Sequence, residues 1–273
     1  MSQRAVEPIF ATTTPIRYKS VEGGGTGFFL NHNGETYLVT NRHVVDPEDE
    51  SPDQARIWFR NYRDIANTNH FDISLSGGDS KDWFGHPESA DIDLAVIPLD
   101  TRLSSVDDVG SQNHMTGSLA FTRQHYIHEN ISVDNRVVIL GYPGDFVDKT
   151  TLFPVRRNAL ISSPYGTRFN GSPFFVTDAR MHPGTSGSPV LMQAGGMMMT
   201  SGDVPEERSK GVYLLGVHSA TFYRSERGES ENEDQLWSET HDDSENGDEQ
   251  PTKYELNVAW YPELIDDVLQ QID

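Results

Sequence analysis

The sequence predicts an all-β protein, because short apolar runs recur through its first two-thirds with turn residues between them and no helical pattern. One pair is Gly27–Leu30 and Tyr37–Thr40, on either side of Asn31-His32-Asn33-Gly34. Two such runs around an Asn/Gly turn indicate a β-hairpin. Strands at this spacing favour a sandwich or packed barrels over alternating βαβ units.

The other candidate strands share this character, and only the C-terminal end is helical. After Pro262, the apolar residues Leu264, Ile265, Val268 and Leu269 fall on one helical face. The remaining predicted strands are Ala55–Arg60, Phe71–Leu75, Leu94–Pro98, Arg136–Gly141, Asn158–Ser162, Phe174–Thr177, Pro189–Met192, Val212–Val217 and Glu255–Trp260.

Length and composition limit the classes of protein this chain can belong to. A chain of 273 residues is long for one ordinary domain but normal for two packed barrels. It has no cysteine, which excludes disulfides, a thiol nucleophile and a Cys-based zinc site. With 42 Asp+Glu against 21 Lys+Arg, the formal charge of −21 disfavours nucleic acid and anionic membranes as partners.

The chain shows no targeting segment. Met1–Pro8 holds no apolar run that could be a signal-peptide core, and no stretch approaches the roughly 18 apolar residues that span a bilayer. Together with the missing cysteines, this predicts a cytoplasmic protein.

Two segments resemble insertions. Gln193–Gly211 is rich in glycine and polar residues, and residues 225–251 hold eleven acidic residues and one basic one, a net of −10. Such composition is typical of a mobile surface loop. A regulatory or partner-binding loop beside the active site is the alternative.

Ser186 lies in a turn with small neighbours, Pro183-Gly184-Thr185-Ser186-Gly187-Ser188. Gly184 lets the backbone bend, and the amides of Gly184 and Ser186 could hold a developing oxyanion. By itself such a sequence usually forms only a turn. A serine nucleophile also needs a base that takes its proton.

A histidine and a carboxylate complete the set. His43 ends an apolar strand, and Asp93 precedes the run Leu94–Ile97. Each alone is more often structural, but together with Ser186 they follow the chain order His, Asp, Ser of chymotrypsin-type enzymes. Asp91 competes with Asp93, because residues two apart on a strand share a face.

These motifs resemble the trypsin/chymotrypsin-like serine peptidases, and most closely the HtrA (DegP-type) protease domain without a PDZ domain. The similarity runs in order from about Gly25 to Ala220. The segments that carry it are Gly25-Thr26-Gly27-Phe28-Phe29, Leu38-Val39-Thr40-Asn41-Arg42-His43-Val44-Val45, Asp93-Leu94-Ala95-Val96, Val137-Val138-Ile139-Leu140-Gly141-Tyr142-Pro143, Thr177-Asp178-Ala179 with Pro183-Gly184-Thr185-Ser186-Gly187, and Leu214-Leu215-Gly216-Val217-His218-Ser219-Ala220.

The resemblance implies two packed six-stranded antiparallel β-barrels. The N-terminal barrel, residues 1–118, carries His43 and Asp93. The C-terminal barrel, residues 119–273, carries Ser186, the acidic insertion 225–251 and a C-terminal helix. It implies serine endopeptidase activity on a protein or peptide substrate, with His43, Asp93 and Ser186 as the triad, Gly184 and Ser186 as oxyanion donors, and no cofactor. Oligomeric partners stay open. The alternative function is a protein-binding module that is catalytically weak or inactive.

The same resemblance places the pocket for the residue before the scissile bond (P1) at Arg180, Met181, Val217, His218, Ser219 and Ala220. Met181 favours an apolar P1, whereas His218 makes Glu or Gln the alternative. A basic P1 is disfavoured, because no aspartate stands at Arg180 or Met181. Thr185 departs from digestive relatives, whose aspartate there receives a new N-terminus. His125 and His128 lack a placed third ligand, so we expect no metal.

Overall fold

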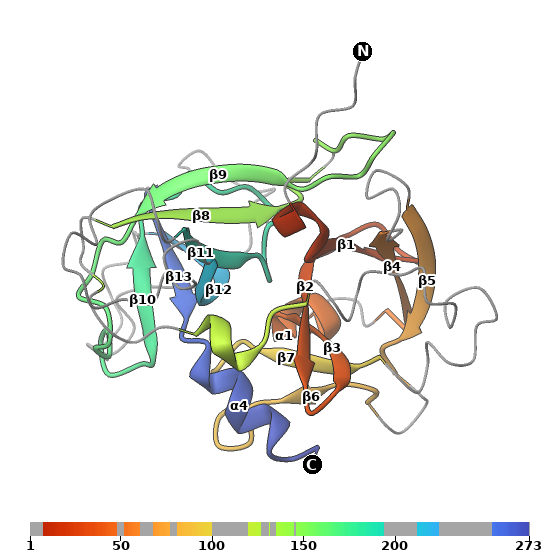
Figure 1. Ribbon diagram of the computed structural model, residues 1–273, viewed down its shortest axis with the longest axis horizontal. Coiled ribbons are helices and arrows are strands. Elements are labelled where there is room, and N and C mark those ends of the chain that lie inside the picture. Colours follow the sequence, from red (N-terminus) through yellow and green to blue (C-terminus); the bar gives the residue numbers. More distant parts are fainter. Residues whose placement is uncertain are drawn as a thin grey trace, which may run out of the picture.

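The computed structural model describes residues 8–47, 52–60, 68–76, 81–99, 120–126, 131, 135–144, 146–193, 212–223 and 253–272. Within them the chain forms two antiparallel sheets that lie side by side, with the N-terminal sheet on the right of Figure 1. The short helices are η1 (Pro8–Ala11), α1 (Arg42–Val45), η2 (Arg123–His125) and α4 (Glu263–Leu269). No helix in these ranges is long and apolar enough to span a membrane.

The N-terminal sheet has the strand order β5-β4-β1-β2-β3-β7-β6. Its edges are linked where the amide of Asp82 donates to the carbonyl of Leu75 at 3.3 Å, just before β6 and just after β5. The strands are β1 (Thr13–Tyr18), β2 (Gly24–His32), β3 (Glu35–Thr40), β4 (Gln54–Arg60), β5 (Thr68–Ser74), β6 (Phe84–Gly85) and β7 (Ala95–Pro98).

The C-terminal sheet has the order β10-β13-β12-β11-β8-β9. It closes where the amide of Ser162, just after β9, donates to Val176 of β10 at 2.7 Å. The strands are β8 (Arg136–Gly141), β9 (Val155–Leu160), β10 (Phe174–Thr177), β11 (Pro189–Gln193), β12 (Val212–Tyr223) and β13 (Lys253–Trp260). The predicted all-β double-barrel fold is confirmed, with a seventh, two-residue strand β6 added at the edge of the first sheet.

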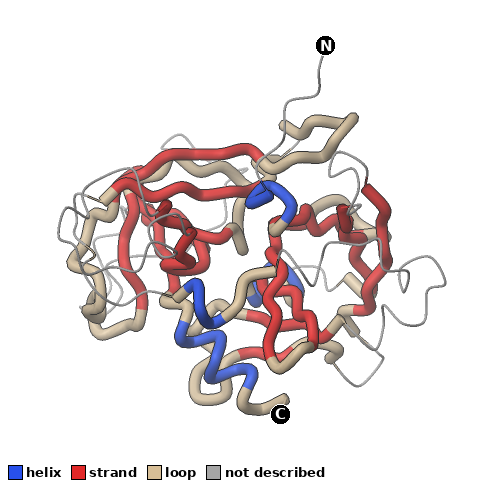
Figure 2. The backbone as a smooth tube through the Cα atoms, in the orientation of Figure 1, coloured by secondary structure: helices blue, strands red, loops and turns tan. Residues whose placement is uncertain are grey.

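The continuous apolar runs arise because many strands are buried on both faces. Along β2, Phe29 points into the N-terminal barrel, while Phe28 and Leu30 join a cluster that includes Val217 and Trp260 of the other barrel. The buried residues of α4 pack against the same cluster, and Figure 2 shows this helix below the junction of the two sheets. This shared core holds the barrels together.

Most predicted strands appear within a few residues of their expected bounds. The sequence missed β1, because Pro15 interrupts its pattern and Ile16 is its only large aliphatic residue. The predicted insertion 193–211 except Gln193, all of the predicted acidic insertion 225–251, and the predicted boundary between residues 118 and 119 lie outside the described residues.

Phe29 and Phe146 provide a matched test of the core. Phe29 is 1% exposed and stacks on Phe59 at 5.3 Å between ring centroids, whereas Phe146 is 75% exposed. We expect Phe29→Ala to lower the free energy of unfolding by about 3–5 kcal/mol. Phe146→Ala should change it by less than about 0.5 kcal/mol. Urea unfolding of both variants measures this, and equal losses would contradict the assigned core.

Candidate active site

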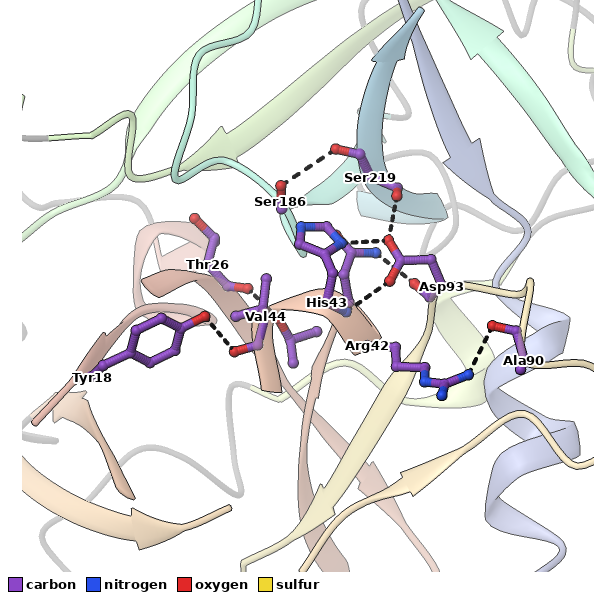
Figure 3. A network of polar contacts seen from close by, with 11 residues as sticks. Tyr18, Thr26, Arg42, His43, Val44, Ala90, Asp93, Ser186 and Ser219 are labelled. Carbon is purple, nitrogen blue, oxygen red and sulfur yellow. Dashed lines mark hydrogen bonds and ion pairs between the residues drawn. The ribbon is translucent and has the colours of Figure 1, made fainter. Parts of the chain in front are cut away.

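Pairing of β3 with β7 brings His43 close to Asp93. Thr40 lies opposite Ala95 in this ladder, so the residues just after β3 and just before β7 meet at one end of the barrel. The side-chain amide of Asn41 donates to the carbonyl of Asp93 at 2.7 Å. On the other side of α1, the Tyr18 hydroxyl donates to the carbonyl of Val44 at 2.9 Å (Figure 3).

The carboxylate of Asp93 is held by three donors. Its Oδ2 lies 2.8 Å from Nδ1 of His43 and accepts from the Ser219 hydroxyl at 2.5 Å, while its Oδ1 accepts from the backbone amide of His43 at 3.0 Å. Because a carboxylate only accepts, the proton of a neutral His43 ring sits on Nδ1, which leaves Nε2 as its acceptor nitrogen. The ring orientation is therefore fixed as a general base requires.

Burial alone would raise the pKa of Asp93. The charge of His43 and the hydrogen bonds from His43 and Ser219 outweigh this effect and lower the pKa to about 2. The Asp93 side chain is 11% exposed and that of His43 24%. An ionised, nearly buried carboxylate therefore faces a ring that solvent or substrate can reach.

Asp91 does not contact His43. Its carboxylate is exposed and accepts from the hydroxyl of Ser89 at 3.4 Å. The geometry therefore favours Asp93 over Asp91 as the partner of His43.

Ser186 lies in the turn between β10 and β11, close to the His43 ring in Figure 3. Its hydroxyl donates to the carbonyl of Ser219 at 3.5 Å, the long limit of a hydrogen bond. The structure thus brings His43, Asp93 and Ser186 together from both barrels.

The backbone amides around Ser186 divide into two groups. Those of Thr185, Gly187 and Ser188 donate to the carbonyls of His182, His218 and Thr185. No hydrogen bond among the described residues uses the amides of Gly184 or Ser186. These two are the amides that the sequence predicts as oxyanion donors.

Two glycines allow this turn to pack tightly. Gly184 has φ +89°, and a Cβ there would lie 2.7 Å from the carbonyl oxygen of Tyr142. Gly187 has φ +85°, and a Cβ there would lie 2.1 Å from the carbonyl oxygen of Thr26. Both the left-handed conformation and the contact exclude a larger residue.

Thr26 of β2 binds the turn to the N-terminal barrel. Its hydroxyl donates to the carbonyl of Gly184 at 2.8 Å and accepts from the amide of Tyr142 at 3.0 Å. Its own amide donates to the carbonyl of Ser186 at 2.9 Å. The sequence analysis assigned no role to Thr26 or to the hydroxyl of Ser219, because these contacts join residues more than 100 positions apart.

The predicted pocket residues differ in their surroundings. Met181 and Val217 are buried in hydrophobic clusters, Arg180 is exposed, and Ala220 is half-buried. His218 is 2% exposed, its Nε2 lies 3.3 Å from Oγ1 of Thr185, and its Nδ1 has no partner in the described structure. Burial, together with the charge of His43, lowers its pKa to about 3, so the ring is neutral.

The described residues show no metal site, and a cavity in the structure lies apart from His43 and Ser186. No group of three or more His, Asp or Glu side chains within the described ranges could hold a metal ion; of the two histidines considered, His125 bonds Thr122, and His128 is outside those ranges. A cavity of about 590 Å³ lies between the loops around residues 86–92 and 168–173 and helix α4, away from His43 and Ser186.

A family model described as the trypsin-like peptidase domain matches residues 25–198, more than half of the chain. The chain belongs to the trypsin-like peptidase family. It is 24% identical over 211 residues to a probable periplasmic serine endoprotease, DegP-like, of Pseudomonas savastanoi pv. phaseolicola. This match covers 77% of the chain but 31% of that relative, so the chain spans about a third of the relative's length.

A solved structure shows the same fold. The serine endoprotease from Yersinia pestis superposes with a TM-score of 0.51 at 14% sequence identity, covering 99% of this chain and 68% of that one. Together with the family match, this similarity confirms the predicted likeness to HtrA-type protease domains.

The buried His218 predicts a pH dependence of stability. Its folded pKa of about 3 lies below the unfolded value of about 6.5, so the unfolded chain binds one more proton between these pH values. Stability should therefore fall as pH drops below about 6.5, by up to about 1.4 kcal/mol per pH unit from this residue. His218→Gln should remove that part of the slope.

Urea unfolding between pH 7 and pH 4 measures the slope for the parent and for His218→Gln. His182→Gln is the control, because the side chain of His182 is exposed. An unchanged slope in His218→Gln would show that this histidine is not buried in the neutral form.

Proposed function

We propose that the chain is a serine endopeptidase that hydrolyses peptide bonds through an acyl-enzyme. His43 is the general base, Asp93 orients it and stabilises its charged form, and Ser186 is the nucleophile. The observation that supports this most is the three-donor fixation of Asp93 against His43, with Ser186 next to the same ring.

In the first half-reaction, Ser186 Oγ attacks the scissile carbonyl carbon while Nε2 of His43 takes the hydroxyl proton. The amides of Gly184 and Ser186 donate to the resulting oxyanion. His43 then gives its proton to the leaving amine, the C–N bond breaks, and the acyl group stays on Ser186 as an ester. Water repeats the sequence, releasing the acid and restoring the serine.

A protein or peptide is the substrate that this chemistry implies, and the reaction needs no cofactor. We propose an apolar P1 residue with Glu or Gln as the second choice. Met181 and Val217 supply apolar side chains near the turn. The buried, unsatisfied nitrogen of His218 is Nδ1, which can donate to a side-chain carbonyl only in the tautomer that carries the ring proton there. The cytoplasmic location stays a prediction.

Removing the triad should abolish turnover without unfolding the chain. Ser186→Ala and His43→Ala should each lower kcat by about 10⁴- to 10⁶-fold, because the triad acts as a unit. Asp93→Asn should cost roughly 10⁴-fold by favouring the wrong tautomer. Steady-state hydrolysis of a peptide substrate gives these values, with Asp91→Asn as the matched control.

Parent-like cleavage by Ser186→Ala would show that the nucleophile is another residue. A parent that neither cleaves peptides nor reacts with a fluorophosphonate would favour the protein-binding module instead.

Cleavage of a peptide library varied at P1 tests the pocket. We expect apolar residues to lead and Lys and Arg to be poor, because no carboxylate stands at Arg180 or Met181. Strong cleavage after Glu or Gln that disappears in His218→Ala would show that the pocket prefers Glu or Gln at P1 through His218. A library led by Lys or Arg would contradict both.

A further inference from the structure

The two proposed oxyanion donors belong to the peptide units Pro183–Gly184 and Thr185–Ser186. All described peptide bonds are trans, and in a trans peptide the carbonyl and the amide point in opposite directions. Whatever holds the two carbonyl oxygens therefore decides where the two amides point. The carbonyl of Thr185 is bonded within the turn, whereas the carbonyl of Pro183 is bonded by a residue from another segment.

The carbonyl of Thr185 is held from within its own turn. It accepts from the amide of Ser188 at 3.1 Å and from the hydroxyl of Ser188 at 2.6 Å. The carbonyl of Pro183 instead accepts from the amide of Gly144 at 2.7 Å, in the segment that follows β8. The direction of the Gly184 amide therefore depends on where Gly144 is held.

Gly144 is held from the other barrel. The guanidinium of Arg17, on β1, donates through Nη2 to the carbonyl of Gly144 at 2.8 Å. This contact joins residues 127 positions apart and uses the charge-assisted donor of a half-buried side chain. Arg17, Gly144 and Pro183 thus form a relay from the N-terminal barrel to the Gly184 peptide.

The segment around Gly144 has further supports from the same barrel. The Tyr142 hydroxyl donates to the carbonyl of Leu152 at 2.8 Å and lies 3.2 Å from the carbonyl oxygen of Thr13, on β1. The guanidinium of Arg60, on β4, donates to the carbonyls of Thr151 and Leu152. These contacts support the segment on either side of Gly144, whereas Arg17 bonds the residue that contacts Pro183.

The turn itself offers no charged contact at Thr185. At Thr185 the side chain is a hydroxyl that donates to the carbonyl of His182 at 2.7 Å, so this position offers no carboxylate for an ion pair. Contacts from outside the turn, those of Thr26 and of the Arg17 relay, therefore add to its order.

We infer that Arg17 is a positioning residue for the oxyanion hole, acting through Gly144 on the Pro183–Gly184 peptide. It touches no reacting atom, and the inference rests on the proposed function. Loss of Arg17 loosens Gly144 and with it the Pro183–Gly184 peptide, so the Gly184 amide donates less well to the oxyanion while the substrate still binds. The cost falls on the transition state.

Arg17→Ala tests this against Arg56→Ala. Arg56 lies opposite Arg17 in the β1–β4 ladder, and its guanidinium donates to the carboxylate of Asp72 instead of to Gly144. For each variant we would measure kcat and KM on a peptide that the parent cleaves, and the inhibition constant of a peptide aldehyde. The Kd of the uncleaved peptide would be measured in a Ser186→Ala background.

For Arg17→Ala we expect kcat to fall by about 10- to 10³-fold, the upper figure being the loss of a whole oxyanion donor. Aldehyde affinity should fall by the same factor as kcat/KM, with little change in peptide Kd, because the aldehyde adduct carries the oxyanion. Millimolar guanidinium should restore part of kcat in Arg17→Ala, and Arg56→Ala should match the parent.

If Arg17→Ala does not fold, Arg17→Lys can replace it, because lysine keeps a charged donor. We expect smaller losses of kcat and of aldehyde affinity in Arg17→Lys, by factors that again match.

Three results would overturn the inference: parent-like kcat in the folded Arg17 variant, a loss confined to KM and peptide Kd, or an equal loss in Arg56→Ala. If the parent protein cleaves the peptide, any of these three results contradicts only the role of Arg17 and not the proposed function. A parent without activity would overturn both.

Discussion

The arrangement of the site depends on the hydrogen bonds that Thr26 donates to the carbonyls of Gly184 and Ser186. Thr26 lies on a strand of the N-terminal barrel, and the turn it binds belongs to the C-terminal barrel. His43 and Asp93 are fixed to the first barrel by the β3–β7 ladder. Without a rigid joint between Thr26 and the turn, the serine and its base would belong to bodies that move separately.

The joint is rigid because Thr26, at its centre, is buried with all its polar groups satisfied. Thr26 is fully buried, and its amide, carbonyl and hydroxyl all have partners. Gly187 allows the backbones to approach, since any side chain there would meet the carbonyl of Thr26. The Arg17 relay adds a second constraint on the same turn, through Gly144 and the carbonyl of Pro183. Both supports cross from one barrel to the other, so disruption of the packing between the barrels is expected to abolish catalysis as well.

Much of this could be predicted from the sequence, and the reasons for the remainder are physical. Hairpins such as β2–β3 are local, so their apolar runs and turn residues indicate them directly. The chain order of His43, Asp93 and Ser186 indicated the family. The structure then showed that Asp93, and not Asp91, contacts His43. The contacts of Ser219, Thr26 and Arg17 could not be read, because each joins a common residue type to a distant backbone or carboxylate group. Only the folded barrels bring such pairs together.

Labelling with a fluorophosphonate followed by peptide mass spectrometry tests most directly whether Ser186 is a nucleophile activated by His43. The account predicts one adduct per chain, on Ser186, that is absent in Ser186→Ala and strongly reduced in a folded His43→Ala variant. An adduct on a different serine, or none on the folded parent, would contradict it.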